Sequence, residues 1–305
     1  YLMPGAIDQI EHKLVDKTIV SLTRIEPPLH PPGPEKMLMD FGIEPEEFRE
    51  QELLDWFKGV QLTQSTKITE GIFAPWAFYK KDFQEIGGHD ELYAPQSKED
   101  SDIFNRFHLN GIKFVQTWGG CVYHMTCRGS RFADGAKRNP DGEVFMKNRE
   151  TDEWLRQNQR STRNFIRKWG HFVKHDALLK PIVPPKYDIG FVVKRCNYEM
   201  LYELEPWCST IYVDPEHVAG YIGMEQDNTL FNLKDRIKYI GNEVTNDIVV
   251  EFDLADLTNQ NWGVISELSS IIKESGEVGE MELDIFKITI NKLETYDEEL
   301  IKCAH

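Results

Sequence analysis

The sequence predicts an α/β protein with two domains, and three observations favour this class. Helical patterns alternate with short runs rich in β-branched residues, as α/β folds require. A proline-rich stretch at residues 176–187 has the composition of a linker. The chain has 305 residues, 40% of them hydrophobic, which is enough to bury two cores. We therefore expect a first domain over 1–175, a linker over 176–187 and a smaller α/β domain over 188–305.

The first domain is expected to begin with a short strand and a helix that starts after Pro4. Residues 19–22 form an apolar run that predicts a buried strand. Residues 23–34 are too rich in proline for a helix or a central strand, so they predict a stiff surface loop. Residues 41–58 then read as a helix.

Three acids gather at the start of the next predicted helix. Glu99, Asp100 and Asp102 precede apolar residues at helical spacing, and Gly111 supplies the stop. One helix cap needs one acid, whereas three crowded carboxylates repel one another unless a cation, a basic partner or a proton reduces their negative charge. Capping and function explain the cluster equally well.

A histidine follows at the end of a predicted strand. Residues 113–117 and 121–124 read as two strands joined by a turn at 118–120, so His124 emerges at a strand end. A lone histidine is more often a surface or core residue than a ligand. Arg128 and Arg131 follow it, and such guanidinium groups either grip phosphate oxygens or lie on a solvated loop.

The order and spacing of these segments resemble the second half of family 2 glycosyltransferases of the GT-A fold. The segments that match are residues 71–83, 86–91 and 99–102, followed by Arg106, Gly111 and His124. The resemblance implies a partial GT-A mixed sheet with flanking helices over the first domain. It also implies that the N-terminal nucleotide-binding half, with its Asp-x-Asp motif, is missing.

The resemblance also implies site residues. Asp100 would be the catalytic base, and His124 would complete a Mn²⁺ or Mg²⁺ site, with Asp102 as a less favoured ligand. Arg128 and, less securely, Arg131 would contact the donor diphosphate.

The acceptor side is implied to include Glu99, Trp76 and Gly88. An indole such as Trp76 can stack on a sugar, although core packing is as good an explanation. The proline-rich loop could line an acceptor groove through Arg24, Glu26 and His30, but a rigid connector is the simpler interpretation.

The second domain shows no catalytic constellation. Strands are predicted at 189–193, 210–213, 248–252 and 283–290, with helices at 198–204, 230–239 and 262–273. Its expected role is docking to an acceptor, a missing half or a second subunit, so oligomerisation through this domain is possible.

Function is therefore expected to be metal-dependent, inverting transfer of a sugar from a nucleotide-sugar donor to a saccharide or other hydroxyl acceptor. The alternative is a non-catalytic carbohydrate-binding or interaction module that retains a GT-A core, and a metal-dependent hydrolase is a weaker third option.

Composition limits the classes of partner and the location that we expect for this chain. A net charge of −16 argues against nucleic acid, and no apolar run is long enough to span a membrane. Five cysteines without a Cys-x-x-Cys pair suit a reducing, cytoplasmic location.

Overall fold

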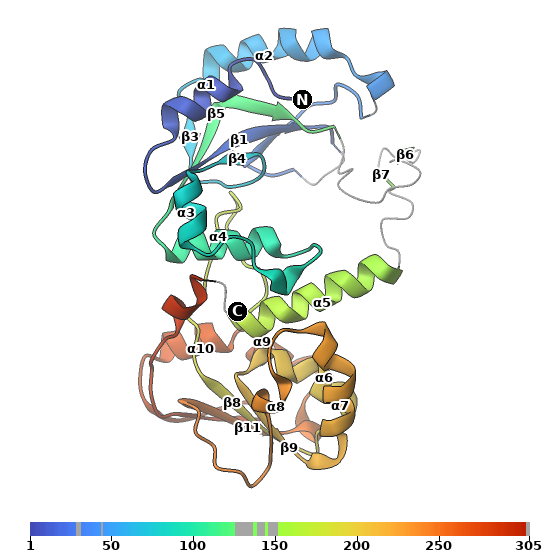
Figure 1. Ribbon diagram of the computed structural model, residues 1–305, viewed down its shortest axis with the longest axis vertical. Helices are drawn as coiled ribbons and strands as arrows, with labels where there is room; N and C mark the ends of the chain where they lie inside the picture. Colours follow the sequence, from blue (N-terminus) through green and yellow to red (C-terminus); the bar gives the residue numbers. More distant parts are fainter. Residues whose placement is uncertain (29–31, 44, 126–136, 139–143, 146–151, 303–305) are drawn as a thin grey trace. The chain divides into compact units, whose positions relative to one another are not determined.

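A computed structural model describes residues 1–28, 32–43, 45–125, 137–138, 144–145 and 152–302 (Figure 1). The chain divides into two compact units. Unit 1 combines Tyr1–Gly88, Phe107–Leu155 and His175–Ile182, and unit 2 combines His89–Arg106, Arg156–Lys174 and Val183–His305. This division differs from the predicted boundary, because 89–106 and 156–174 belong to unit 2. Among the described helices, none combines the length and the apolar character needed to cross a bilayer.

Unit 1 is built on a five-stranded mixed sheet. Its central strand β1 (Thr18–Glu26) runs parallel to β2 (Lys36–Leu38) and to β5 (Lys113–Tyr123). Strand β4 (Trp76–Ala77) pairs antiparallel with β1, and β3 (Ile68–Thr69) pairs antiparallel with β5. A separate two-stranded ladder joins β6 (Lys137–Arg138) to β7 (Val144–Phe145). The strand predicted at 19–22 is confirmed, but β1 continues to Glu26, so the predicted loop begins later than expected.

Strand β5 replaces the two strands and the turn that were predicted between residues 113 and 124. The pairing of β5 with β1 shifts register between Leu22 and Thr23, which marks a bulge rather than a reversal of the chain. A Cβ at Gly119 would lie 2.6 Å from the main-chain oxygen of Ser65, so glycine here permits a close approach of two backbones. His124 directly follows the last residue of β5, as predicted.

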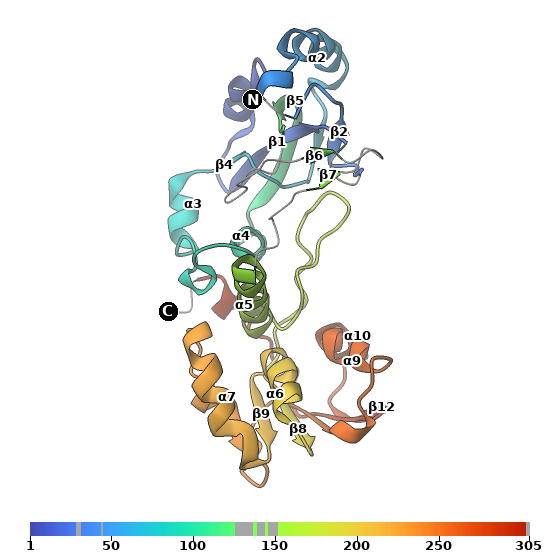
Figure 2. The ribbon, with the colours of Figure 1, turned by 90° about the vertical axis from the view of Figure 1, so that its right-hand side faces the viewer.

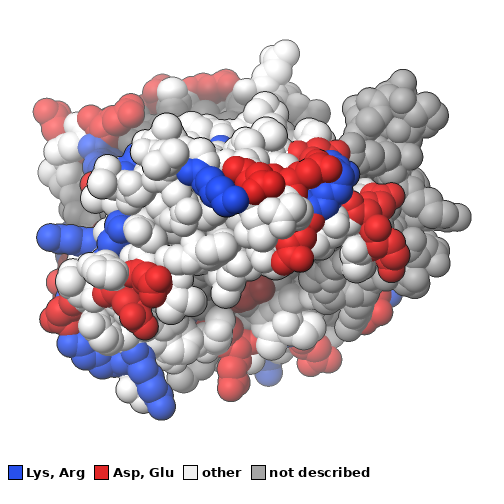
Figure 3. Space-filling view, turned by 90° about the horizontal axis from the view of Figure 1, so that it is seen from above, with Lys and Arg blue, Asp and Glu red and all other residues white. Residues whose placement is uncertain are grey.

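Helices α1 (Ala6–Lys13) and α2 (Glu50–Gln64) cover one face of this sheet (Figure 1). Leu53 and Phe57 of α2 pack in a buried cluster with Met3 and Tyr123. The predicted start of this helix at residue 41 is wrong, because Gly42 adopts a φ of 101° and forms a turn. Figure 3 views the molecule from above and shows small clusters of Asp and Glu side chains among scattered Lys and Arg side chains. Helix α3 (Lys80–Glu85) follows β4.

Unit 2 contains a six-stranded mixed sheet in the order β10-β9-β8-β11-β13-β12. Strands β8 to β11 are parallel, and β13 runs antiparallel to both of its neighbours. The bounds are β8 (Ile189–Lys194), β9 (Thr210–Val213), β10 (Ile237–Tyr239), β11 (Ile248–Asp253), β12 (Gly279–Leu283) and β13 (Phe286–Ile290). Both units therefore have the predicted general α/β class. The single strand predicted at 283–290 is wrong, because Asp284, with a φ of 53°, turns the chain between β12 and β13.

The helices of unit 2 flank this sheet, and Figure 2 shows α7 and α10 on opposite sides of it. Their bounds are α6 (Tyr198–Leu204), α7 (Val218–Glu225), α8 (Leu233–Arg236), α9 (Trp262–Ser266) and α10 (Leu268–Ser275). The predicted helix at 230–239 is only α8 followed by β10, and the one at 262–273 is interrupted at Glu267. Helix α7 was not predicted. Helices α4 (Glu99–Leu109) and α5 (Asp152–Trp169) each contribute residues to both units.

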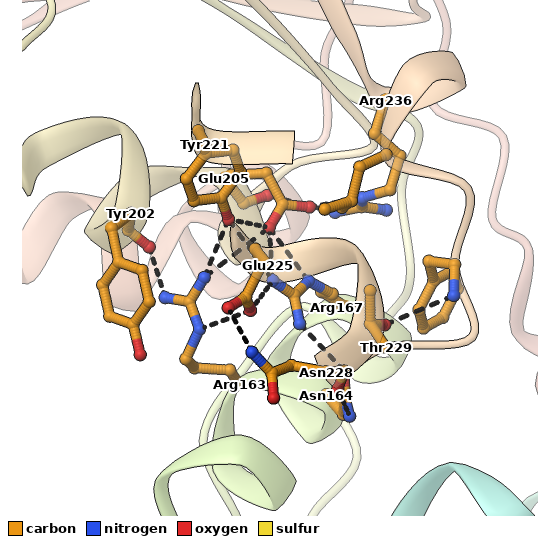
Figure 4. A network of polar contacts seen from close by, with 12 residues as sticks. Arg163, Asn164, Arg167, Tyr202, Glu205, Tyr221, Glu225, Asn228, Thr229 and Arg236 are labelled. Carbon is orange, nitrogen blue, oxygen red and sulfur yellow. Dashed lines mark hydrogen bonds and ion pairs between the residues drawn. The ribbon is translucent and has the colours of Figure 1, made fainter. Parts of the chain in front are cut away.

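Helix α5 is bound to unit 2 by a buried group of charges that we call the arginine cluster (Figure 4). It contains three arginines and two glutamates, namely Arg163, Arg167, Arg236, Glu205 and Glu225. Arg167 Nη2 donates to Glu205 Oε2 at 2.7 Å and to Glu225 Oε1 at 2.5 Å. Arg163 Nε donates to Glu225 Oε1 at 3.0 Å, and Arg236 Nε to Glu205 Oε1 at 2.6 Å. These buried ion pairs explain why residues 156–174 group with unit 2, because their separation would leave unpaired charges.

Candidate functional site

In unit 1, a buried carboxylate lies at the carboxyl end of the sheet. Glu26 is the last residue of β1 and is 0% exposed. Its Oε1 accepts from Arg24 Nη1 at 3.0 Å and lies 2.9 Å from His124 Nδ1, while its Oε2 lies 2.9 Å from Lys36 Nζ. Parallel strands place their carboxyl ends at one edge, so residues from β1, β2 and β5 meet here. This edge is where open α/β sheets bind ligands.

The charges around Glu26 keep it ionised. Burial alone would raise the pKa of Glu26, but His124, Lys36 and Arg24 lower it to about 2. Arg24 Nη2 also pairs with Glu35 Oε1 at 3.1 Å. The carboxylates of Glu26 and Glu35 therefore form one network with Arg24 and Lys36. An ionised Glu26 fixes the orientation of the His124 ring, because one ring nitrogen is held at the carboxylate.

His124 lines a pocket of about 630 Å³ in unit 1, a size typical of ligand sites. Its walls are mainly apolar and include Phe73, Pro75, Val122 and Met125. The Arg24 guanidinium carbon lies 3.8 Å from the centre of the Phe73 ring, a cation–π contact that joins this wall to the Glu26 network. The pocket thus combines an apolar surface with one imidazole, and the buried Arg24 contacts its Phe73 wall.

The described part of the chain does not assemble a metal centre around His124. None of its groups of His, Cys, Asp and Glu side chains reaches the three members that could hold a metal ion. One imidazole, with its Nδ1 at Glu26, is too small a donor set for Mn²⁺ or Mg²⁺, which prefer several oxygen ligands. The predicted diphosphate residues Arg128 and Arg131 lie outside the described residues.

In unit 2, Asp100 lies exposed on the first turn of α4. Partial burial and the neighbouring carboxylate of Glu99 raise the pKa of Asp100, while His89 acts in the opposite direction. Glu99 Oε2 is buried and has no hydrogen-bond partner among the described residues. The proton affinity of Asp100 is therefore raised, which is the direction that favours a general base.

Asp102 has a different environment from Asp100. It is 0% exposed, and its Oδ1 accepts from Lys168 Nζ at 2.7 Å and from Trp169 Nε1 at 3.0 Å. Its Oδ2 accepts from Arg106 Nε at 2.7 Å, and the Tyr93 hydroxyl lies 3.3 Å from Oδ1. Both oxygens are engaged by donors, so Asp102 acts here as a structural carboxylate of the α4–α5 packing and is poorly placed to bind a cation.

Searches of protein-family models and of curated proteins found no match to this chain. Its candidate site therefore depends on geometry alone.

The remaining predicted residues lie in unit 1. Trp76 is half-buried on β4, opposite Ser21 of β1. Gly88 has a φ of 80°, so the turn after α3 itself requires glycine at this position. Arg24 and Glu26 were expected only as possible contacts of the proline-rich loop, but they belong to β1, and Lys36 and Phe73 were not predicted as site residues. The opposite charges at residues 24 and 26, and again at 35 and 36, were the available signal.

The structure thus brings His124 together with Glu26, Arg24 and Phe73 in unit 1. It brings Asp102 together with the basic residues of α4 and α5 in unit 2, and leaves Asp100 exposed and Glu99 half-buried on the same first turn.

Proposed function

We propose that this chain contains part of a GT-A glycosyltransferase that moves a sugar from a nucleotide-diphosphate sugar to an acceptor hydroxyl. The observation that carries the proposal is the contrast between two acids of one helix turn. Asp102 is fully engaged by internal donors, whereas Asp100 is exposed, has a raised pKa and makes no hydrogen bond to a described residue. This contrast supports Asp100 as the group that exchanges a proton with substrate.

In this proposal the reaction is a single displacement with inversion. Asp100 accepts the proton of the acceptor hydroxyl as that oxygen forms a bond to the anomeric carbon. The bond from this carbon to the diphosphate breaks in the same step, and the nucleoside diphosphate leaves. Glu99 raises the proton affinity of the base, and Trp76 and Gly88 would lie on the acceptor side.

The leaving diphosphate needs positive charge to stabilise it. Arg128 and Arg131 are proposed to supply this charge, with His124, held by Glu26, as a further polar contact to the diphosphate. Dependence on Mn²⁺ or Mg²⁺ remains a prediction, and the chemistry above uses no step through the metal. The mixed five-stranded sheet with flanking helices is consistent with a partial GT-A domain.

The test is nucleotide release from a panel of nucleotide sugars, with and without Mn²⁺ and acceptor sugars. Asp100→Asn should reduce the rate by about 10²–10⁴-fold, the usual contribution of a general base. Asp152→Asn is the matched control, since Asp152 is another exposed acid in the first turn of a helix. Equal rates for Asp100→Asn and the control would refute Asp100 as the base.

A non-catalytic carbohydrate-binding module is the second candidate. It is favoured by the apolar pocket beside Phe73, and by the lack of a metal-ligand cluster within the described part of the chain. In that case no donor would release nucleotide, whereas saccharides would bind to wild-type protein and bind more weakly to Phe73→Ala.

A further inference from the structure

Unit 2 contains a pocket of its own, with a volume of about 370 Å³. This volume suits a small organic ligand. Basic and aromatic side chains share its walls, which include Lys186, Arg236, Tyr187, Phe231 and Tyr296. Nothing in the proposed sugar transfer uses these residues.

Lys186 brings a poorly compensated positive charge to this pocket. Its Nζ donates to the main-chain oxygen of Arg167 at 3.1 Å and forms no ion pair within the described residues. An ammonium group has three donors, so two remain unused by protein acceptors there. Burial and the neighbouring Arg236 lower the pKa of Lys186 to about 8, so most of the Lys186 side chains still carry a charge at pH 7.

Arg236 presents a second unused donor. Its Nε bonds Glu205 Oε1 at 2.6 Å, and its Nη2 bonds the main-chain oxygens of Glu205 and Cys208 at 3.0 and 2.6 Å. Its Nη1 makes no hydrogen bond to a described residue. The guanidinium also lies 5.3 Å from the centre of the Phe231 ring, so charge and aromatic surface adjoin in the pocket.

Ion pairs leave one positive charge at the pocket unmatched. The arginine cluster (Figure 4) sets three guanidinium groups against two carboxylates, and Lys186 adds a positive charge that forms no ion pair within the described residues. Lys168 also lines the pocket, but Asp90 and Asp102 neutralise it.

Two carboxylates line the pocket without pairing with Lys186. Asp188 accepts from Asn246 Nδ2 at 2.7 Å, and Glu299 is exposed. A desolvated ammonium group without an ion pair is costly unless an anion compensates it.

We propose that this pocket binds a phosphate monoester that carries a ring, such as a sugar phosphate or a nucleoside monophosphate. The phosphate would accept from Lys186 Nζ and Arg236 Nη1. The ring would lie against Phe231 and Tyr296. This site is independent of the proposed sugar transfer and can be tested without it.

The test is calorimetric titration of the full chain with phenyl phosphate, inorganic phosphate, benzoate and phenol in a phosphate-free buffer. Phenyl phosphate should bind wild type most tightly, and its affinity should fall at least tenfold in Lys186→Met. Lys273→Met is the control, because Lys273 is exposed on α10, and it should bind as wild type does. Phe231→Ala should weaken phenyl phosphate but leave inorganic phosphate unchanged.

Three results would overturn the proposal. If phenyl phosphate does not bind the wild-type protein, the proposed site does not exist. If phenyl phosphate binds Lys186→Met as tightly as wild type, the ammonium group of Lys186 does not contribute to binding. If benzoate binds as tightly as phenyl phosphate, the pocket has no preference for a dianion. If Lys186→Met does not fold, Lys186→Arg, which keeps the charge, must retain binding and Phe231→Ala must lose the preference for the ring.

Discussion

The arginine cluster makes a quantitative prediction about Glu205. This carboxylate is 0% exposed and bonds both Arg167 and Arg236. Burial would raise its pKa, but Arg236 and Arg167 lower it to about 2 from an ordinary value of 4.5. A difference of about 2.5 pKa units between folded and unfolded chain corresponds to about 3 kcal/mol. Breaking a buried ion pair costs about 3–5 kcal/mol, so Glu205→Gln should lower the free energy of unfolding by at least 3 kcal/mol at pH 7.

The dependence of this loss on pH identifies its origin. The folded-state pKa of Glu205 lies below the unfolded value, so the stabilisation is complete above pH 4.5 and is lost as the pH falls toward 2. The difference between wild type and Glu205→Gln should therefore shrink between pH 5 and pH 3.

The assay is urea unfolding followed by tryptophan fluorescence, since Trp207 is buried two residues from Glu205. Glu274→Gln, at an exposed position of α10, is the control and should change the free energy by less than about 0.5 kcal/mol. A loss below about 1 kcal/mol for Glu205→Gln, or one that is the same at pH 7 and pH 3, would refute this reasoning.

Three further predictions use other buried or paired groups. Glu99→Gln should move the acid limb of the pH–rate profile of sugar transfer to lower pH, because the Glu99 charge raises the pKa of Asp100; an unmoved limb would count against their coupling. Burial lowers the pKa of His171 to about 4 from 6.5, so the free energy of unfolding should fall by up to about 3 kcal/mol as the pH drops from 6.5 to 4. In urea titrations, His171→Gln should make the free energy of unfolding less dependent on pH over this range. Burial raises the pKa of Cys121 and Cys208 to about 12, so iodoacetamide at pH 8 should alkylate them only after unfolding, as mass spectrometry of peptides would show.

Strands that correspond to short runs rich in apolar residues were predictable from the sequence. The runs at 189–193, 210–213 and 248–252 are continuous and β-branched, and each became a strand of the unit 2 sheet. The start of α2 was not predictable, because the φ of Gly42 depends on a turn that local propensity does not reveal. The bulge in β5 similarly depends on what packs against Gly119.

The candidate site was predictable only in part. His124 was correctly placed at a strand end, but its partner Glu26 lies 98 residues earlier and meets it through the register of parallel strands. The different environments of Asp100 and Asp102 follow from helix geometry, since residues two apart point to nearly opposite sides of a helix. Treating the three acids as one cluster concealed that difference.

The assembly of unit 2 from three separate stretches of chain also constrains how it folds. Glu225 meets Arg163 and Arg167 only after α5 has docked, and Glu205 is paired with Arg236 alone until then, so the last third of the chain holds acceptors for a helix that precedes it. Contacts between distant parts of a chain slow folding, because loop closure must come first. A fragment that begins after the proline-rich stretch at 176–187 would leave Glu225 without its arginines and Glu205 with Arg236 alone, and we expect it to be aggregation-prone and short-lived rather than an autonomous domain.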